Sequence, residues 1–152
     1  MDEQAPMQRL AADPGFLLSR AGAAVRAGFK DVLAGWGIRP VQYVILLVLD
    51  TRDGLSQQEL CTAARVDSGN MVELVDGLET LRYAQRTRDP HDRRRYLVTI
   101  TPGGRSALAA VRQAVSAYNQ RFFSPLSGPE QRQLVATLAK LYGQDGPGLP
   151  RP

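Results

Sequence analysis

Two adjacent helix starts in the middle of the chain constrain its fold more than any other feature. Ser56 and Glu59 have the spacing of a capping box, in which each side chain satisfies a backbone N–H of the other. The helix that follows fades near Ala64, and Asp67 is placed to cap the next helix, whose apolar positions continue to Leu81. Two helices separated by only about three residues are the signature of a helix-turn-helix.

A predicted β-hairpin follows these two helices at once. Strand-like runs over residues 84–88 and 95–100 flank Asp89-Pro90-His91-Asp92, whose residue types favour a tight turn. Residues 86–95 hold five arginines and two aspartates, so +3 of the chain's net charge of +4 lies there. A hairpin tip with these guanidinium groups fits an anionic groove such as the minor groove of DNA. The alternative is a charged turn that is only solvated.

Helical periodicity covers most of the remaining chain. Helices are predicted from Asp13-Pro14 to Gly37, from Pro40 to about Thr51, from Thr101-Pro102 onward, and from a second capping box at Ser127 to Tyr142. The expected fold is mainly α with a small β-hairpin wing, that is, a winged helix-turn-helix with helices from both chain ends.

The helices at the two ends carry heptad-like apolar stripes, which need a partner. A second copy of the chain would supply it, although the stripes could instead cover the chain's own core. We expect a single chain, 1–152, in which residues 38–101 form the winged helix-turn-helix. Residues 14–36 and 102–142 are expected to be dimerisation helices, and residues 143–152 a disordered tail rich in Gly and Pro.

The composition argues against a secreted or membrane protein. The single cysteine, Cys61, cannot form an internal disulfide, and a buried packing thiol is its expected role. No signal peptide is visible, and no apolar run approaches the roughly 18 residues that a membrane span needs. We expect a cytoplasmic protein with no membrane partner.

The sequence gives no sign of an enzyme. A Gly-rich phosphate loop, a Cys/His cluster and a nucleophile elbow are all missing from it. His91 is the only histidine, and with Asp89 and Asp92 it falls short of a metal site. We therefore predict no catalytic residues, no cofactor and no metal.

Several motifs together carry a family resemblance. They are Pro40-Val41-Gln42-Tyr43, Leu55-Ser56-Gln57-Gln58-Glu59-Leu60, Val75-Asp76-Gly77-Leu78-Glu79, and Arg88-Asp89-Pro90-His91-Asp92-Arg93-Arg94 continuing to Leu97, Thr101 and Gly104. On these residues the chain resembles the multiple antibiotic resistance regulator (MarR) family of bacterial transcription factors, from about residue 16 to residue 142.

The resemblance implies a homodimeric winged-helix repressor that binds double-stranded DNA at an inverted repeat. It also implies a small effector, often aromatic or phenolic, that releases the DNA. Arg94 would enter the minor groove with Asp92 orienting it, and Arg86, Arg88 and Arg93 would contact phosphates. The predicted DNA-binding residues are Ser56, Gln57, Ser68, Gly69, Asn70, Glu73, Arg86, Arg88, Asp92, Arg93 and Arg94. The candidate effector-pocket residues are Arg26, Phe29, Trp36 and Tyr43, which could equally be core or interface residues.

The chain departs from the family pattern in the fourth predicted helix, which would enter the major groove. That helix is acidic, and Glu73 stands where many relatives have a basic residue. An acidic reading helix leaves open an alternative function, a winged-helix ligand or protein interaction module with weak or lost DNA binding. Arg82 also stands where relatives usually have Gly, so we expect a differently built turn there, and Arg39 stands where Ser or Thr often caps the second helix.

Overall fold

The computed structural model describes residues 10, 12–52 and 54–145. The chain divides into two units, Met1–Ser116 and Ala117–Pro152, and helix α6 contributes to both. Most of the N-terminal segment and residues 146–152 of the predicted tail lie outside the described residues.

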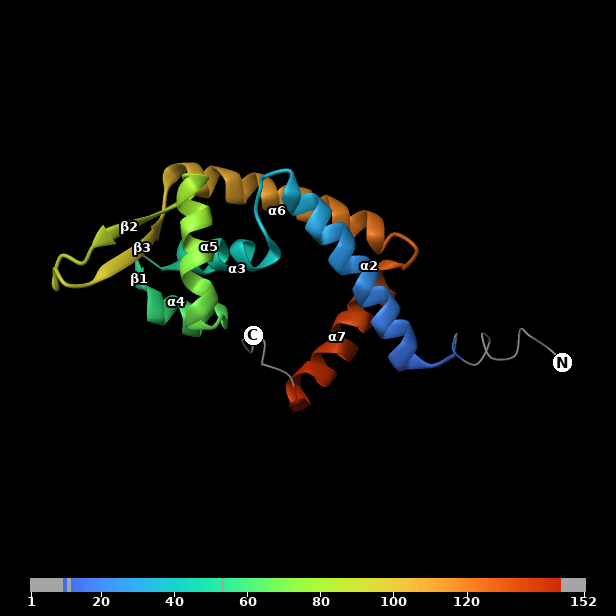
Figure 1. Ribbon diagram of the computed structural model, residues 1–152. Coiled ribbons are helices and arrows are strands. Elements are labelled where there is room, and N and C mark those ends of the chain that lie inside the picture. The colour runs from blue at the N-terminus through green and yellow to red at the C-terminus, as the bar shows by residue number, and fades with distance from the viewer. Residues whose placement is uncertain (1–9, 11, 53, 146–152) are drawn as a thin grey trace. The chain divides into compact units, whose positions relative to one another are not determined.

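The elements follow the predicted order of four helices, a hairpin and two helices (Figure 1). Their bounds are α2 Pro14–Ala34, α3 Pro40–Thr51, β1 Leu55–Ser56, α4 Gln57–Ala64, α5 Ser68–Thr80, β2 Ala84–Arg88, β3 Tyr96–Ile100, α6 Pro102–Phe122 and α7 Gly128–Asp145. The fold class is confirmed as mainly helical with a small sheet. Helix α2 ends before the predicted Gly37, and α7 runs on through residues 143–145 of the predicted tail.

Side-chain caps start the helices where the sequence predicts them. The Asp13 carboxylate accepts from the backbone N–H of Phe16, and Asp67 accepts from that of Asn70. Ser56 is the N-cap of α4, with its backbone N–H donating to the Glu59 carboxylate at 2.9 Å. Because each cap satisfies a backbone donor that the helix itself cannot, the helix starts are locally encoded.

The wing has a third strand that the sequence did not predict. Strand β3 lies in the middle of the sheet, with β2 and β1 antiparallel on either side. β1 is only two residues long, Leu55 opposite Val98 and Ser56 opposite Leu97. Such a short strand has no periodicity of its own, and the same residues begin the cap of α4, so the expected two-stranded wing was wrong by one strand.

The core of the first unit lies between α3, α4, α5, the sheet and the first half of α6. Each of these elements contributes fully buried apolar side chains. They include Ile45, Leu46, Leu49, Leu60, Met71, Val75, Leu78, Val98, Leu108 and Val111. The Cys61 side chain packs against this core as predicted, but it is half-buried and not buried.

The turn between α5 and β2 accommodates an arginine in a conformation that usually favours Gly. Arg82 has φ 59°, in the left-handed region, and its carbonyl accepts from the Thr101 hydroxyl at 2.6 Å. The turn therefore holds Arg82 in a left-handed conformation, which costs a residue with a Cβ roughly 1–2 kcal/mol.

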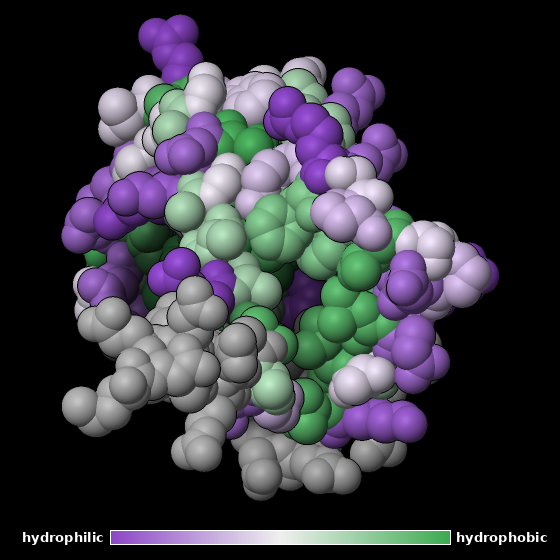
Figure 2. Space-filling view, turned by 90° about the vertical axis from the view of Figure 1, so that its right-hand side faces the viewer, coloured by the Kyte–Doolittle hydropathy of each residue, from purple (hydrophilic) through white to green (hydrophobic). Residues whose placement is uncertain are grey.

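In the second unit, the start of α7 is tied to the loop after α6. The Gln131 amide donates to the carbonyls of Phe123 and Leu126, at 3.1 and 3.0 Å, and Ser127 and Glu130 form the predicted second capping box. Val135 and Leu141 on α7 are 68% and 60% exposed. Figure 2 shows apolar side chains reaching the surface among polar ones.

Among the helices of the described residues, none is long and apolar enough to cross a membrane.

Candidate nucleic-acid interface

The wing tip is held in shape by two aspartates acting on the backbone. Asp89 Oδ1 accepts from the His91 backbone N–H at 2.8 Å, and Asp92 Oδ1 accepts from the Arg94 backbone N–H at 3.0 Å. The hydrogen bond from His91 lowers the pKa of Asp89 below its ordinary value. Arg93 and Arg94 are exposed at this turn. Asp92 therefore fixes the main chain that carries Arg94, whereas the expected role was to hold the Arg94 guanidinium.

The other wing arginines have partners within the chain. The Arg88 guanidinium lies over the Tyr96 ring, 5.8 Å from its centroid, and Arg95 Nη2 lies 3.8 Å from Glu59 Oε2. Because these contacts are exposed, each contributes little free energy, and either arginine could give its contact up to bind a DNA phosphate.

Arg86 is held more firmly, against the side of α5. Its Nη1 donates to Asp76 Oδ1 at 2.7 Å and to Glu79, and its backbone N–H donates to Glu79 Oε1 at 2.7 Å. The side chain is only 24% exposed. The structure thus places the guanidinium of Arg86 in a clamp between β2 and α5, which a phosphate contact would have to open.

Helix α5 presents the polar residues that were predicted to read DNA. Ser68, Gly69, Asn70 and Glu73 are all exposed on its first two turns. The Asn70 amide donates to Asp67 Oδ2 at 2.7 Å, so the cap also orients a predicted base-reading side chain. This side-chain hydrogen bond and the backbone one lower the pKa of Asp67. The backbone N–H of Asn70 donates to the Asp67 carboxylate, which confirms the predicted helix cap.

The predicted residues at the start of α4 are placed differently. The Ser56 hydroxyl donates to Glu59 Oε2 and accepts from the Glu59 backbone N–H as the cap of α4. Gln57, the first residue of α4, is half-buried. Ser56 is thus a structural cap first, and a DNA contact from it would have to share the hydroxyl.

The acidic character of α5 is offset inside the chain. Asp76 and Glu79 both pair with Arg86, and Glu73 Oε1 lies 3.0 Å from Nη2 of Arg39. Asp67 is already engaged as the cap. Each α5 carboxylate therefore has a partner, and two arginines from other elements supply positive charge that the helix lacks.

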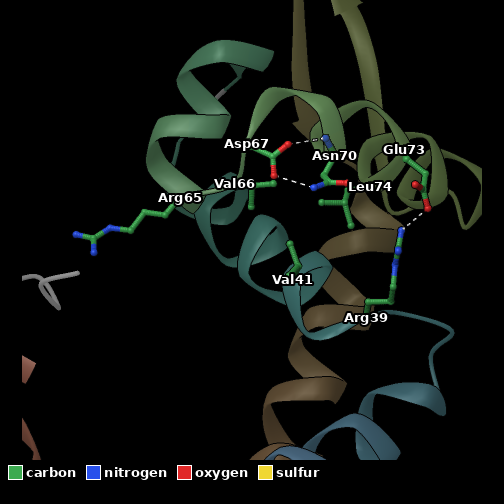
Figure 3. A pocket seen from close by; sticks show the side chains of 8 residues that line it. All are labelled: Arg39, Val41, Arg65, Val66, Asp67, Asn70, Glu73 and Leu74. Atoms are coloured by element: carbon green, nitrogen blue, oxygen red, sulfur yellow. Dashed lines mark hydrogen bonds and ion pairs between the residues drawn. The ribbon is translucent and has the colours of Figure 1, made fainter. Parts of the chain in front are cut away.

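Beside α5 lies a recess of about 330 Å³ that sequence patterns do not reveal. It is lined from the start of α3, the α4–α5 turn and α5, and Figure 3 shows Arg39 and Glu73 on one side with Asp67 and Asn70 above. The lining residues are Arg39, Val41, Arg65, Val66, Asp67, Asn70, Glu73 and Leu74. They come from three separate segments, so only the folded chain brings them together.

Known proteins are similar to this chain in sequence and in architecture. A model of the MarR family matches residues 36–95. The putative transcriptional regulatory protein for the hcr operon of Thauera aromatica is 38% identical over 137 residues, which cover 90% of this chain and 82% of that protein. The chain belongs to the MarR family of transcriptional regulators.

Solved structures of MarR-family relatives agree. The transcriptional repressor CouR bound to a 23-mer DNA duplex matches with a TM-score of 0.77 and 31% identity, over 89% of this chain and 96% of that one. CouR from Rhodococcus jostii RHA1 bound to p-coumaroyl-CoA matches with a TM-score of 0.70 and 32% identity, over 87% and 93% of the two chains.

The residues predicted for an effector pocket in this MarR-family chain are only partly brought together. Phe29 and Tyr43 meet edge to face, with ring centroids 5.7 Å apart, and both pack against the core, as Trp36 does. Arg26 is exposed on α2. Neither the recess beside α5 nor a second small cavity at α7 is lined by these four residues.

Within the part of the chain that the structure describes, no three His, Cys, Asp or Glu side chains are grouped so as to hold a metal ion.

Proposed function

We propose that this MarR-family regulator is a homodimeric repressor that binds an inverted-repeat operator with α5 and the wing of each protomer. The observation that carries the proposal is the wing tip, where Arg93 and Arg94 are exposed on a turn made rigid by Asp89 and Asp92. Because the main chain of the tip is already fixed, only the two side chains lose freedom when they meet an anionic groove.

The two arginines are assigned different contacts. Arg94 enters the minor groove, where a narrow groove concentrates negative potential, and Arg93 contacts the flanking phosphates. Ser68 and Asn70 face base edges in the major groove, where Asn can bond adenine through two hydrogen bonds. The Asp67 cap holds the Asn70 amide toward one orientation for that contact.

The proposed dimer covers the apolar side chains that each unit exposes. Leu17 and Leu18 on α2 are 48% and 49% exposed, and Val135 and Leu141 on α7 are more so. Two wings and two α5 helices related by a two-fold axis would reach successive major grooves about 34 Å apart.

The proposed effector is a small aromatic or phenolic molecule. The DNA binding of the similar Bordetella bronchiseptica protein BpsR is regulated by 6-hydroxynicotinic acid, and CouR has been solved with p-coumaroyl-CoA, a larger thioester of a phenolic acid. It would favour a dimer geometry in which the two α5 helices no longer match the operator. A coupling free energy of about 1–3 kcal/mol corresponds to a change in DNA affinity of about 5- to 150-fold. The alternative of a module without strong DNA binding rested on the acidic α5, whose carboxylates are in fact paired.

The proposal is tested by measuring binding to the DNA upstream of the protein's own gene in a salt series. If about eight phosphates are neutralised per dimer, log K against log salt concentration falls with a slope of roughly −7. A slope near zero, or no binding to any promoter fragment at low salt, would reject the proposed function.

A further inference from the structure

An arginine from outside α5 pairs with a carboxylate on the exposed face of that helix. Arg39, immediately before α3, places its Nη2 3.0 Å from Oε1 of Glu73. The two residues are 34 positions apart in the sequence. Their side chains are 56% and 74% exposed, so the pair lies on the surface that α5 would present to DNA.

A buried amide fixes the main chain of Arg39 against α5. Gln42 is only 3% exposed. Its Oε1 accepts from the Arg39 backbone N–H at 2.8 Å, and its Nε2 donates to the Leu74 carbonyl at 3.1 Å. Gly77 leaves the space for this amide, since a Cβ there would stand 2.6 Å from Nε2. Position 39 is thus tied to the turn of α5 that carries Glu73.

The pair sits on the same side of α5 as the predicted base-reading residue. Asn70 and Glu73 are three residues apart and therefore neighbours on one helical face. Both line the recess beside α5 together with Arg39 (Figure 3). When a helix lies in the major groove, a guanidinium beside that helix lies close to the DNA phosphates that border the groove.

Resting on the proposed DNA binding, we propose that Arg39 contacts a DNA phosphate beside α5 and that Glu73 is its positioning residue. A guanidinium has five N–H donors, so it can serve a carboxylate and a phosphate oxygen at once. Holding the fork in one place lowers the ordering cost of the phosphate contact. Arg39, immediately before α3, then supplies the positive charge that many relatives have at position 73.

A competing explanation is that Glu73 simply repels the DNA backbone and that Arg39 only shields it. The two explanations differ in the sign of one effect. If Glu73 positions Arg39, its truncation weakens binding while Arg39 is present. If it only repels, truncation tightens binding whether or not Arg39 is present.

The experiment measures Kd and salt slope of the full chain for the upstream duplex by fluorescence anisotropy. The variants are Arg39→Ala, Arg39→Lys, Glu73→Ala, Glu73→Gln and the double variant Arg39→Ala/Glu73→Ala, with Arg132→Ala on α7 as a control of equal charge loss. Circular dichroism confirms that each variant is folded.

Arg39→Ala is expected to weaken binding about tenfold and to reduce the steepness of the salt slope by about 2, one phosphate contact being lost per protomer. Arg39→Lys keeps the slope, because it keeps the charge. Glu73→Ala weakens binding of the otherwise unchanged chain but tightens binding of Arg39→Ala. Glu73→Gln, which retains an acceptor for the guanidinium, stays near the wild-type Kd.

The proposal is overturned if Arg39→Ala behaves as Arg132→Ala does, or if Glu73→Ala tightens binding in both backgrounds. Such results would leave the proposed repressor function intact, because the unmodified chain would still bind. A wild-type chain that binds no DNA would instead remove the proposed function and, with it, the role of Arg39.

Discussion

At the scale of single residues, two neighbouring glycines at the start of α6 have very different surroundings. A Cβ at Gly104 would collide with the Tyr83 carbonyl oxygen and stand 2.9 Å from Ile100 Cγ1. A Cβ at Gly103 would meet its nearest atom, the Arg82 carbonyl oxygen, at an ordinary 3.5 Å. Helix α6 therefore passes so close to the backbone of Tyr83, just before β2, that only glycine fits at position 104.

Gly104→Ala is expected to lower the free energy of unfolding by about 3 kcal/mol, because the clash is with backbone, which cannot rotate away. Gly103→Ala is the matched control. It should be neutral or stabilise by about 0.5–1 kcal/mol, because Ala favours a helix over Gly. Urea unfolding of the two variants measures the difference, and equal midpoints would contradict the close approach.

The wing arginines give a second prediction at this scale. Arg94→Ala should raise the Kd for operator DNA by about 10- to 100-fold, as expected for a lost groove contact, while Arg93→Ala costs a few-fold as a lost phosphate contact. Anisotropy titrations measure both, and size-exclusion chromatography checks that the oligomeric state is unchanged. Equal losses would mean that the two roles are wrongly assigned.

At the scale of elements, Arg86 joins the wing to α5. Its guanidinium pairs with Asp76 and Glu79, and its backbone N–H also binds Glu79. Arg86→Ala leaves two neighbouring carboxylates without their cation, one of them only 33% exposed, and should destabilise by about 1–3 kcal/mol. Arg88→Ala, which removes an exposed contact with Tyr96, should cost less than about 0.5 kcal/mol. Similar losses in chemical denaturation would show that the clamp contributes nothing.

The capping carboxylates make stability fall in acid. Hydrogen bonds from Ser56 lower the pKa of Glu59 from 4.5, and those of Asn70 lower that of Asp67 from 3.8. A carboxyl whose pKa is lower in the folded chain stabilises it above the unfolded value, and this contribution is lost as the pH falls through the folded value. The urea concentration at the unfolding midpoint should therefore not depend on these groups near pH 7. It should decrease when the pH is lowered below 4.5.

Asp67→Asn separates the cap from the charge. Asn is as good an N-cap as Asp but does not titrate, so this variant should keep its α5 cap and lose less stability in acid than the parent chain. Urea midpoints of both chains at pH 7 and near pH 3.5 measure how much stability each loses in acid. An unchanged acid dependence would assign it to other groups.

At the scale of the whole molecule, the parts that sequence could predict are those with local causes. Helix starts follow from caps three residues apart, such as Asp67 with Asn70, and the wing follows from alternation around a turn. The partner of Glu73 lies 34 positions away, and no pattern links it to Arg39. Strand β1 is equally hidden, because its two residues pair only once β3 is in place. The predicted effector pocket depends on long-range packing of the same kind and stays a prediction.

The short strand β1 has a consequence for how a signal can reach DNA. Leu55 and Ser56 join the wing to the start of α4, while Arg86 joins the wing to α5 and Gln42 joins α3 to α5. These contacts link the wing, α3, α4 and α5 to one another. If the proposed operator binding is right, we expect an effector to change how these linked elements are placed on the DNA together, and not the arrangement of one of them alone.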